Sequence, residues 1–162
     1  MRKNVFFIFI LAFLFSSCGH ESAIDKYRAE KYVRDSISLT EQQRSLAYYE
    51  SQLESLMPVS DSLLPLFKYE KNERYQDHGY YVTNGTNGLR ILVRDDGRNV
   101  LMYRNGKRFT ESGDRLTGKD REMYERANHL QIVISDIKEL EKRIARTSSE
   151  VQKYQKRLQK QK

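Results

Sequence analysis

The side chains best suited to catalysis or metal binding are few in this chain and lie far apart. Its 162 residues include one cysteine, Cys18, and three histidines, His20, His78 and His129. Zinc sites combine several Cys or His ligands at characteristic spacings, and none of the histidines has a second His or Cys at such a spacing. We therefore predict no metal site, and we interpret His129, beside Leu130 in a helical pattern, as a residue of a helix surface.

Two short acidic motifs suggest chemistry but are better interpreted as turns. Asp77-His78-Gly79 could orient an imidazole with a carboxylate, as general acid–base catalysis requires. Asp95-Asp96-Gly97 lacks the staggered oxygen ligands and the closing glutamate of a calcium loop. The sequence also has no phosphate-binding loop, nucleophile elbow or zinc-binding helix motif. We therefore expect neither an enzyme nor a cofactor.

The single cysteine ends a segment with the plan of a secretory signal peptide. Arg2 and Lys3 are positively charged, Val5–Phe15 is an apolar run of eleven residues, and two serines and Cys18 follow. Eleven helical residues rise only about 16 Å, roughly half the hydrocarbon core of a bilayer. The run is too short for a good transmembrane anchor and is typical of a leader that directs export and is then removed.

The end of this segment, Phe15-Ser16-Ser17-Cys18, resembles the lipobox of bacterial lipoproteins, although Phe15 stands where leucine is usual. In that family a peptidase cuts before the cysteine, whose sulfur already carries diacylglycerol. The resemblance implies that residues 1–17 are removed, that Cys18 is the lipidation site and that acyl chains such as palmitate tether the protein to the cell envelope. Gly19 favours the outer membrane over the inner one by analogy with the enteric sorting rule. An ordinary cleaved signal or an uncleaved anchor is the alternative.

Two three-residue motifs resemble the Asp-Ser/Thr-aliphatic acceptor pattern for O-glycosylation of exported proteins in some Gram-negative bacteria. They are Asp35-Ser36-Ile37 and Asp61-Ser62-Leu63, so Ser36 and Ser62 are candidate modified residues. Both lie where we expect a helix to bend or end, which would accommodate a sugar.

Positive charge is concentrated at the C-terminal end of the chain. The sequence has 29 Lys and Arg against 22 Asp and Glu, a net charge of +7. From residue 142 onward the only acid is Glu150, and the candidate contacts to an anionic surface are Lys153, Lys156, Arg157, Lys160 and Lys162. Each such cation gains about 1 kcal/mol beside anionic lipid. Nucleic acid is not an expected partner, because the chain is exported.

Two long helices are predicted from apolar side chains that recur every seven residues. The second helix runs from about Lys119 to the C-terminus and repeats Met123, Leu130, Ile137, Ile144, Val151 and Leu158. Thr117 or Asp120 is its expected cap.

The first helix is predicted to occupy about Ser22 to Met57, with Pro58 ending it. Its second half repeats Leu39, Leu46 and Leu53. A patchier stripe precedes them, and Ser38 with Glu41 has the form of a capping box, so we expect a break or bend near residues 35–38. The stripe consists of Ile24, Tyr27, Val33 and Ile37.

Between the helices the apolar period falls to two, which indicates strands. Leu89, Ile91 and Val93 alternate with arginines, and turn sequences at residues 84–88, 95–97 and 105–106 favour tight hairpins. We predict a meander of three or four strands from about Tyr80 to Thr110. Cover for one face is expected from Leu63, Leu64, Leu66, Phe67 and Tyr69.

The predicted fold class is α+β. Two long helices form an antiparallel coiled-coil hairpin, with the small antiparallel β-meander inserted between them. The expected division is leader 1–17, tether and first helix 18–57, connector and β-module 58–116, and second helix with its basic end 117–162.

This organisation favours a structural or protein-interaction role, in which a stalk presents the β-module to an envelope protein or glycan, facing the periplasm or the cell surface. The sheet face carrying Arg90, Arg94 and Tyr103 is the recognition candidate. In the alternative, the basic C-terminal helix binds anionic lipid, lipopolysaccharide or peptidoglycan. Because the second helix has more heptads than the first, its surplus could also pair two copies into a homo-oligomer.

Overall fold

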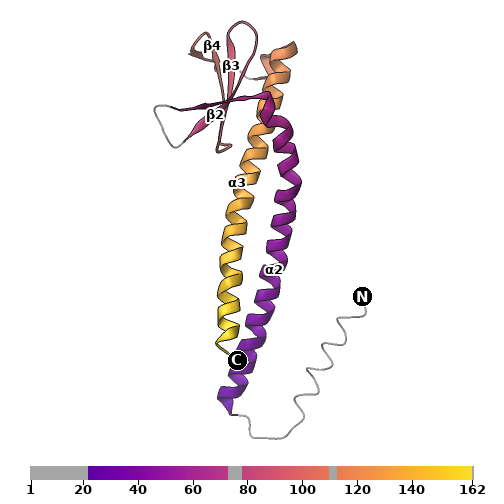
Figure 1. The fold of residues 1–162 in the computed structure, drawn as a ribbon, viewed down its shortest axis with the longest axis vertical. Helices are drawn as coiled ribbons and strands as arrows, with labels where there is room; N and C mark the ends of the chain where they lie inside the picture. Colours follow the sequence, from indigo (N-terminus) through magenta and orange to yellow (C-terminus); the bar gives the residue numbers. More distant parts are fainter. Residues whose placement is uncertain (1–21, 73–77, 110–112, 162) are drawn as a thin grey trace, which may run out of the picture.

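The computed structural model describes residues 22–72, 78–109 and 113–161, and it shows a mixed α+β fold with two long helices and one sheet (Figure 1). In chain order the elements are α2 (Ala23–Leu63), η1 (Leu64–Leu66), β1 (Lys68–Lys71), β2 (Gly79–Asn84), β3 (Leu89–Arg94), β4 (Val100–Arg104), β5 (Lys107–Arg108), η2 (Gly113–Arg115) and α3 (Gly118–Gln159). The leader, Cys18, His20, Asp77, Thr110 and Lys162 lie outside the described residues. In the described part, neither helix is long and apolar enough to span a bilayer.

The two helices run antiparallel and pack against each other, as predicted (Figure 1). In α2, Leu39, Leu46 and Leu53 are half-buried. In α3, each apolar position of the seven-residue repeat is buried or half-buried, namely Met123, Leu130, Ile137, Ile144, Val151 and Leu158. The heptad pattern therefore identified the faces that the helices bury.

The predicted bend near residues 35–38 and the predicted end at Pro58 are both wrong, because α2 is one continuous helix. Ser22 begins it and accepts a hydrogen bond from the Asp25 N–H on its Oγ at 3.3 Å. Serine and aspartate inside an established helix cost only about 0.5 kcal/mol each. Pro58 removes one backbone donor at a cost of about 3 kcal/mol. The turn after it offsets that cost by burying Leu63 in the core.

Both glycosylation-like serines consequently lie within α2 and not at breaks. Ser36 is half-buried in the helix interior. Ser62 is exposed in the last turn, where its Oγ donates a hydrogen bond to the Val59 carbonyl at 2.7 Å. The expected loop-like surroundings for a sugar are therefore not found at either serine.

The first three turns of α2 extend beyond the end of α3. Gln161, just after α3, donates from Nε2 to Oδ2 of Asp35 at 3.0 Å, which marks where the pairing stops. In the predicted stripe, Ile24 is 63% exposed and Tyr27 is 59% exposed. The unpaired surplus of helix thus belongs to α2, whereas the heptad count assigned it to the second helix.

The sheet is an antiparallel meander of five strands in the order β1-β2-β3-β4-β5. β1 was not predicted, because we assigned its residues to the connector. In β3 the expected alternation is confirmed, with Leu89, Ile91 and Val93 buried. The β4–β5 turn has φ angles of 49° at Asn105 and 77° at Gly106, as a type I′ hairpin requires.

The sheet packs on the side of α3, so the prediction that it is inserted between the helices is wrong in its placement (Figure 1). A sheet with one apolar face needs an apolar helix face against it. α3 supplies that face through Ala127, Leu130 and Ile134, which join Leu89 and Ile91 in one core. The expected cover from the connector is partial. Leu63 is buried and Leu64 and Phe67 are half-buried, but Leu66 and Tyr69 are exposed.

Two polar contacts hold turns of the sheet against α3. The carboxylate of Asp120, only 8% exposed, accepts hydrogen bonds from the N–H and the Oγ1 of Thr86, each at 2.7 Å. Gln131 donates from Nε2 to the carbonyl of Gly97. Asp120 therefore binds the β2–β3 turn, and Thr117 occupies the N-cap position of α3 without a side-chain capping bond.

Gly97 is required both by its backbone angle and by its closeness to α3. Its φ is 72°, and a β-carbon there would lie 2.5 Å from the backbone nitrogen of Ser135. We expect Gly97→Ala to lower the free energy of unfolding by about 1–2 kcal/mol from the positive φ alone, and further because the turn must move away from the helix. Urea denaturation followed by circular dichroism measures this loss.

Gly106→Ala is the matched control for this prediction. Gly106 has a φ of 77°, but within the described ranges no atom lies within 4 Å of its would-be β-carbon. Gly106→Ala should lose only the part of the free energy of unfolding that is due to the positive φ. Equal losses in the two variants would contradict the tight packing of Gly97 on α3.

Candidate functional site

A groove lies between one edge of the sheet and α3, where side chains of several elements converge. Its volume is about 720 Å³, and it is lined by Tyr69, His78, Tyr81, Asp95, Asp96, Arg98, Lys138 and Lys142. The tyrosines come from β1 and β2, the carboxylates from the β3–β4 turn and the lysines from α3. This mixture of rings and charges makes the groove the candidate binding site.

Two tyrosines form the sheet side of the groove. Tyr69 and Tyr81 are direct partners in the β1–β2 register, and their ring centroids are 5.3 Å apart. Tyr69 remains 50% exposed. Gly79 makes room for it, since a β-carbon on Gly79 would lie 2.1 Å from the Tyr69 hydroxyl oxygen. Because Gly79 has no side chain, it does not cover the rings of Tyr69 and Tyr81.

Asp95 organises this wall. Its Oδ2 accepts hydrogen bonds from the Gly79 N–H at 2.6 Å and from the Tyr69 hydroxyl at 3.2 Å. Its Oδ1 lies 3.7 Å from Nδ1 of His78. The predicted turn at residues 95–97 is thus confirmed, and its first carboxylate also joins two strands and orients an aromatic ring.

The charges of the groove are divided between its two sides. On the sheet side Asp96 lies 3.1 Å from the Arg94 Nε and 3.2 Å from the Arg98 Nε. On the helix side Lys138 and Lys142 are four residues apart and so project from the same face of α3. Lys138 itself lies 3.8 Å from Oε2 of Glu141. The two lysines therefore place positive charge on the helix side of the groove, opposite the carboxylates of the sheet side.

The surroundings raise the pKa of both phenols of the groove above 10.0. Loss of solvation is the largest cause for each, and Asp95 adds to it through its negative charge and through the hydrogen bond from Tyr69. Asp95→Asn should therefore lower the pKa of Tyr69, as a difference titration of phenolate absorbance against the unchanged protein will measure.

The sign of the accompanying stability change follows from linkage. A phenol whose pKa is raised by folding stabilises the folded state fully below pH 10, and that contribution is lost as the pH rises through the folded pKa. The free energy of unfolding of the unchanged protein should thus fall above about pH 10. That of Asp95→Asn should fall less. Superimposable titration curves would contradict the coupling between Asp95 and the tyrosines.

Arg90, Arg94 and Tyr103 lie on the opposite face of the sheet. In the register Arg90 pairs with Tyr103 and Arg94 with Tyr80, and Arg90 binds Glu70 at 2.7 Å. Since α3 packs on the inner face, these residues face away from it. The three residues of the predicted recognition face thus share one face of the sheet, and within the described residues only Arg94 of the three contacts a residue of the groove, Asp96.

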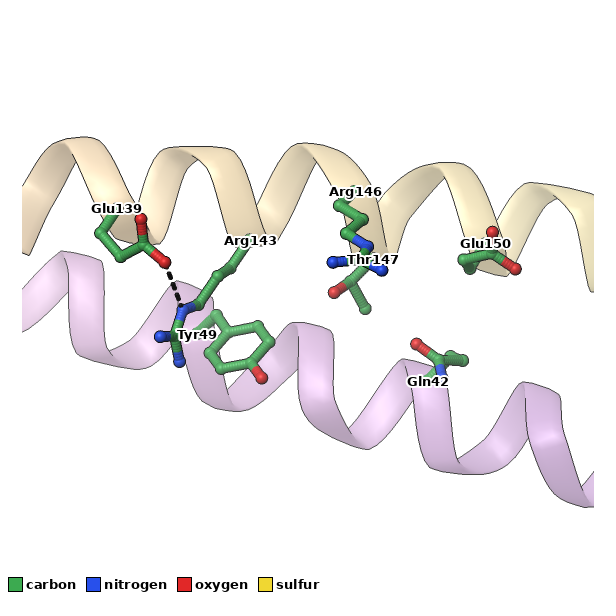
Figure 2. A pocket seen from close by; sticks show the side chains of 7 residues that line it. All are labelled: Gln42, Tyr49, Glu139, Arg143, Arg146, Thr147 and Glu150. Atoms are coloured by element: carbon green, nitrogen blue, oxygen red, sulfur yellow. Dashed lines mark hydrogen bonds and ion pairs between the residues drawn. The ribbon is translucent and has the colours of Figure 1, made fainter.

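A second hollow, of about 530 Å³, interrupts the contact between the helices (Figure 2). Arg143 extends across it, with its Nε 3.1 Å from Glu139 and its guanidinium 5.8 Å from the centroid of the Tyr49 ring. Gln42 and Thr147 line it and lie three residues after Leu39 and Ile144 of the apolar repeats, where a coiled coil has a second apolar position. Polar side chains therefore replace apolar ones here. We interpret the hollow as a weakly packed part of the helix pair.

The predicted anionic-surface residues lie on the last turns of α3. Lys153, Lys156, Arg157 and Lys160 are exposed and line a shallow hollow of about 410 Å³, together with Ser149 and Gln152. Lys153 pairs with Glu150 at 3.3 Å. All of these residues come from one helix, so they form a basic helix face and not a converging site.

Sequence reasoning missed the groove because it needs the sheet to be placed on the side of α3. The available signal was the four-residue spacing of Lys138 and Lys142. In the described ranges no three His, Cys, Asp or Glu side chains are placed to hold a metal ion. Comparisons with protein-family models, curated proteins and solved structures find no match to this chain.

Proposed function

We propose that this chain is a lipid-anchored protein of the bacterial cell envelope with an interaction role. Its helix pair, an antiparallel coiled coil, holds the β-sheet away from the lipid surface for a partner. The supporting observation is the length of α2 between its first residue and the sheet. Val59, which packs against the sheet core, follows Ala23 by 36 residues, which is roughly 54 Å of helix rise.

The groove is the favoured contact for that partner. Tyrosine and arginine side chains contribute much of the binding energy at protein interfaces, and the groove contains Tyr69, Tyr81 and Arg98. Tyr69 is half-exposed and held by Asp95, so little conformational freedom remains to be lost on binding. The lysines of α3 add attraction for carboxylate groups. An envelope protein or glycan carrying such groups fits this surface.

Site-specific photocrosslinking in the native envelope tests the proposal. A benzophenone amino acid is placed at one of four tyrosines in turn: Tyr69 in the groove, Tyr103 on the outer sheet face, Tyr154 near the basic end, and Tyr48 as background. Tyr48 is 61% exposed on α2 and thus resembles Tyr69 in access to solvent. We expect a discrete adduct from position 69 that position 48 does not give.

The same experiment distinguishes the groove from the outer face of the sheet and from the basic end of α3. An adduct from position 103 alone would keep the β-module as the binding element but move the contact to the face with Arg90 and Arg94. An adduct from position 154 alone would favour the basic end. Yields at positions 69 and 103 no higher than at position 48 would contradict the interaction role of the module.

The alternative function is binding of anionic lipid, lipopolysaccharide or peptidoglycan by the basic end of α3. Four exposed cations on one helix face support it. Against it, the contact between Gln161 and Asp35 places that end about 18 Å along α2 from Ala23. This exceeds the screening length of about 8 Å at physiological salt, so an upright α2 keeps these cations out of reach of the lipid to which Cys18 is attached.

Neutralising the four cations tests this alternative without disturbing the helix pair. Glutamine at positions 153, 156, 157 and 160 leaves Tyr154 and Leu158 in place, whereas truncation would remove both. If the alternative holds, non-acylated protein loses binding to anionic vesicles at low salt. Unchanged binding eliminates the basic end as a lipid contact.

A further inference from the structure

The first turns of α2 are the part of the helix pair that no other described element covers. The contact from Gln161 to Asp35 ends the pairing, and residues 23–34 continue past it as a single helix (Figure 1). Ser22 caps this helix, so its first turn is well formed. The exposed end is therefore an ordered surface.

This end carries large apolar side chains in full contact with solvent. Ile24 and Tyr27 are 63% and 59% exposed, and Val33 is also exposed. At 100° per residue Val33 lies opposite Ile24 on the helix, so the apolar groups point in more than one direction. Ile24 and Tyr27 lie about 60° apart near the start of α2, whereas Val33 lies about 14 Å farther along the axis. A surface met end-on would cover Ile24 and Tyr27 together and leave Val33 in solvent.

The short segment between Cys18 and Ala23 limits which surface the first turn of α2 can meet. Ala23 follows Cys18 by five positions, and a fully extended chain covers at most about 18 Å over that separation. Once Cys18 is acylated, the first turn of α2 must remain within that distance of the lipid. Lys26, Arg28 and Lys31 lie beside the apolar residues, together with Glu30 and with Asp25, which is 4.0 Å from Arg28, so residues 22–31 carry a net charge of +1. This small excess has the sign that anionic headgroups attract.

We propose that the first turn of α2 contacts the lipid surface end-on, with Ile24 and Tyr27 in the headgroup region and Lys26 and Arg28 near lipid phosphates. This inference rests on the proposed anchoring through Cys18. Tyrosine suits this depth, because its ring is apolar and its hydroxyl is polar. The contact would hold α2 upright and would make its own first turn, and not the basic end of α3, the part of the protein that binds lipid.

Tryptophan fluorescence tests the contact in the full acylated chain. The protein contains no tryptophan, so Tyr27→Trp and Tyr48→Trp each introduce one reporter. The two tyrosines are 59% and 61% exposed, and 21 residues of helix separate them by roughly 32 Å. Each variant is reconstituted in vesicles of phosphatidylcholine and phosphatidylglycerol, with or without lipids brominated near the headgroup.

We expect brominated lipid to quench the Tyr27→Trp emission, since an interfacial side chain lies at the headgroup boundary, and to leave the Tyr48→Trp emission unchanged. Vesicle flotation, measured separately, reports attachment. A variant that floats with unquenched Tyr27→Trp emission overturns the contact and leaves the anchor intact. Quenching of both variants overturns the end-on arrangement, because it requires α2 to lie along the membrane. Failure to float overturns the anchor and the contact with it.

Discussion

Replacing Cys18 by serine is expected to abolish acylation and to leave residues 1–17 attached, because the lipobox peptidase cuts only before a cysteine that already carries diacylglycerol. The acyl chains that the lipobox resemblance implies each contribute about 0.8 kcal/mol per buried methylene, and Cys18 is the only cysteine that could carry them. The described helices offer no membrane-spanning segment to replace them. Fractionation with immunodetection, and the mass of the mature N-terminal peptide, measure the change.

Ser17→Ala is the control for this experiment. It keeps a small residue next to the cleavage point and should leave the protein in the membrane fraction. Normal removal of residues 1–17 from Cys18→Ser would contradict cleavage at a lipobox. It would instead favour an ordinary cleaved signal.

Leu130→Ala is expected to cause the largest loss of stability, about 2–5 kcal/mol, because it opens a cavity in a filled core. Leu130 is 0% exposed and packs where α3 meets the sheet. In a domain this small such a loss is a large part of the total free energy of unfolding. Guanidinium unfolding of residues 19–162, followed by far-ultraviolet circular dichroism, gives the value.

Ile132→Ala provides the comparison on the same helix. Ile132 is 48% exposed, and alanine is the better helix former, so the change should stay within about 0.5 kcal/mol. If the two variants lost similar free energy, the sheet could not be packed on α3 through Leu130.

The helices were predictable because their signal is local and repeated. The recurring apolar positions of α3 all became buried or half-buried. The C-terminal end of α2 was not predictable, because the local effect of Pro58 opposes a tertiary one. Burial of Leu63 against the sheet core keeps the helix going for five residues beyond the proline.

The strands were likewise predictable where the signal is local, and not where it depends on tertiary contacts. The turns with Asn and Gly were identified because their φ angles need those residues. β1 was missed because it is a short edge strand with two lysines and a glutamate, and only its pairing with β2 gives it a structure. β-Strand propensity reflects such neighbours more than the segment itself.

The candidate site followed from the sequence only in its separate pieces. The turn at residues 95–97 was predicted. The role of Asp95 as acceptor for Gly79 and Tyr69 was not, since it joins residues 16 and 26 positions apart. The groove exists only because α3 lies against one side of the sheet.

The offset between the two helices has a mechanical consequence. α3 packs along α2 from Asp35 onward. A sideways force on the sheet is therefore resisted by two packed helices over most of the length of α2. Below Asp35 the force is resisted by a single helix, which bends more easily. Bending would therefore be concentrated in residues 23–34. Substitutions there would change the range of positions that the sheet can reach without changing the structure of the sheet.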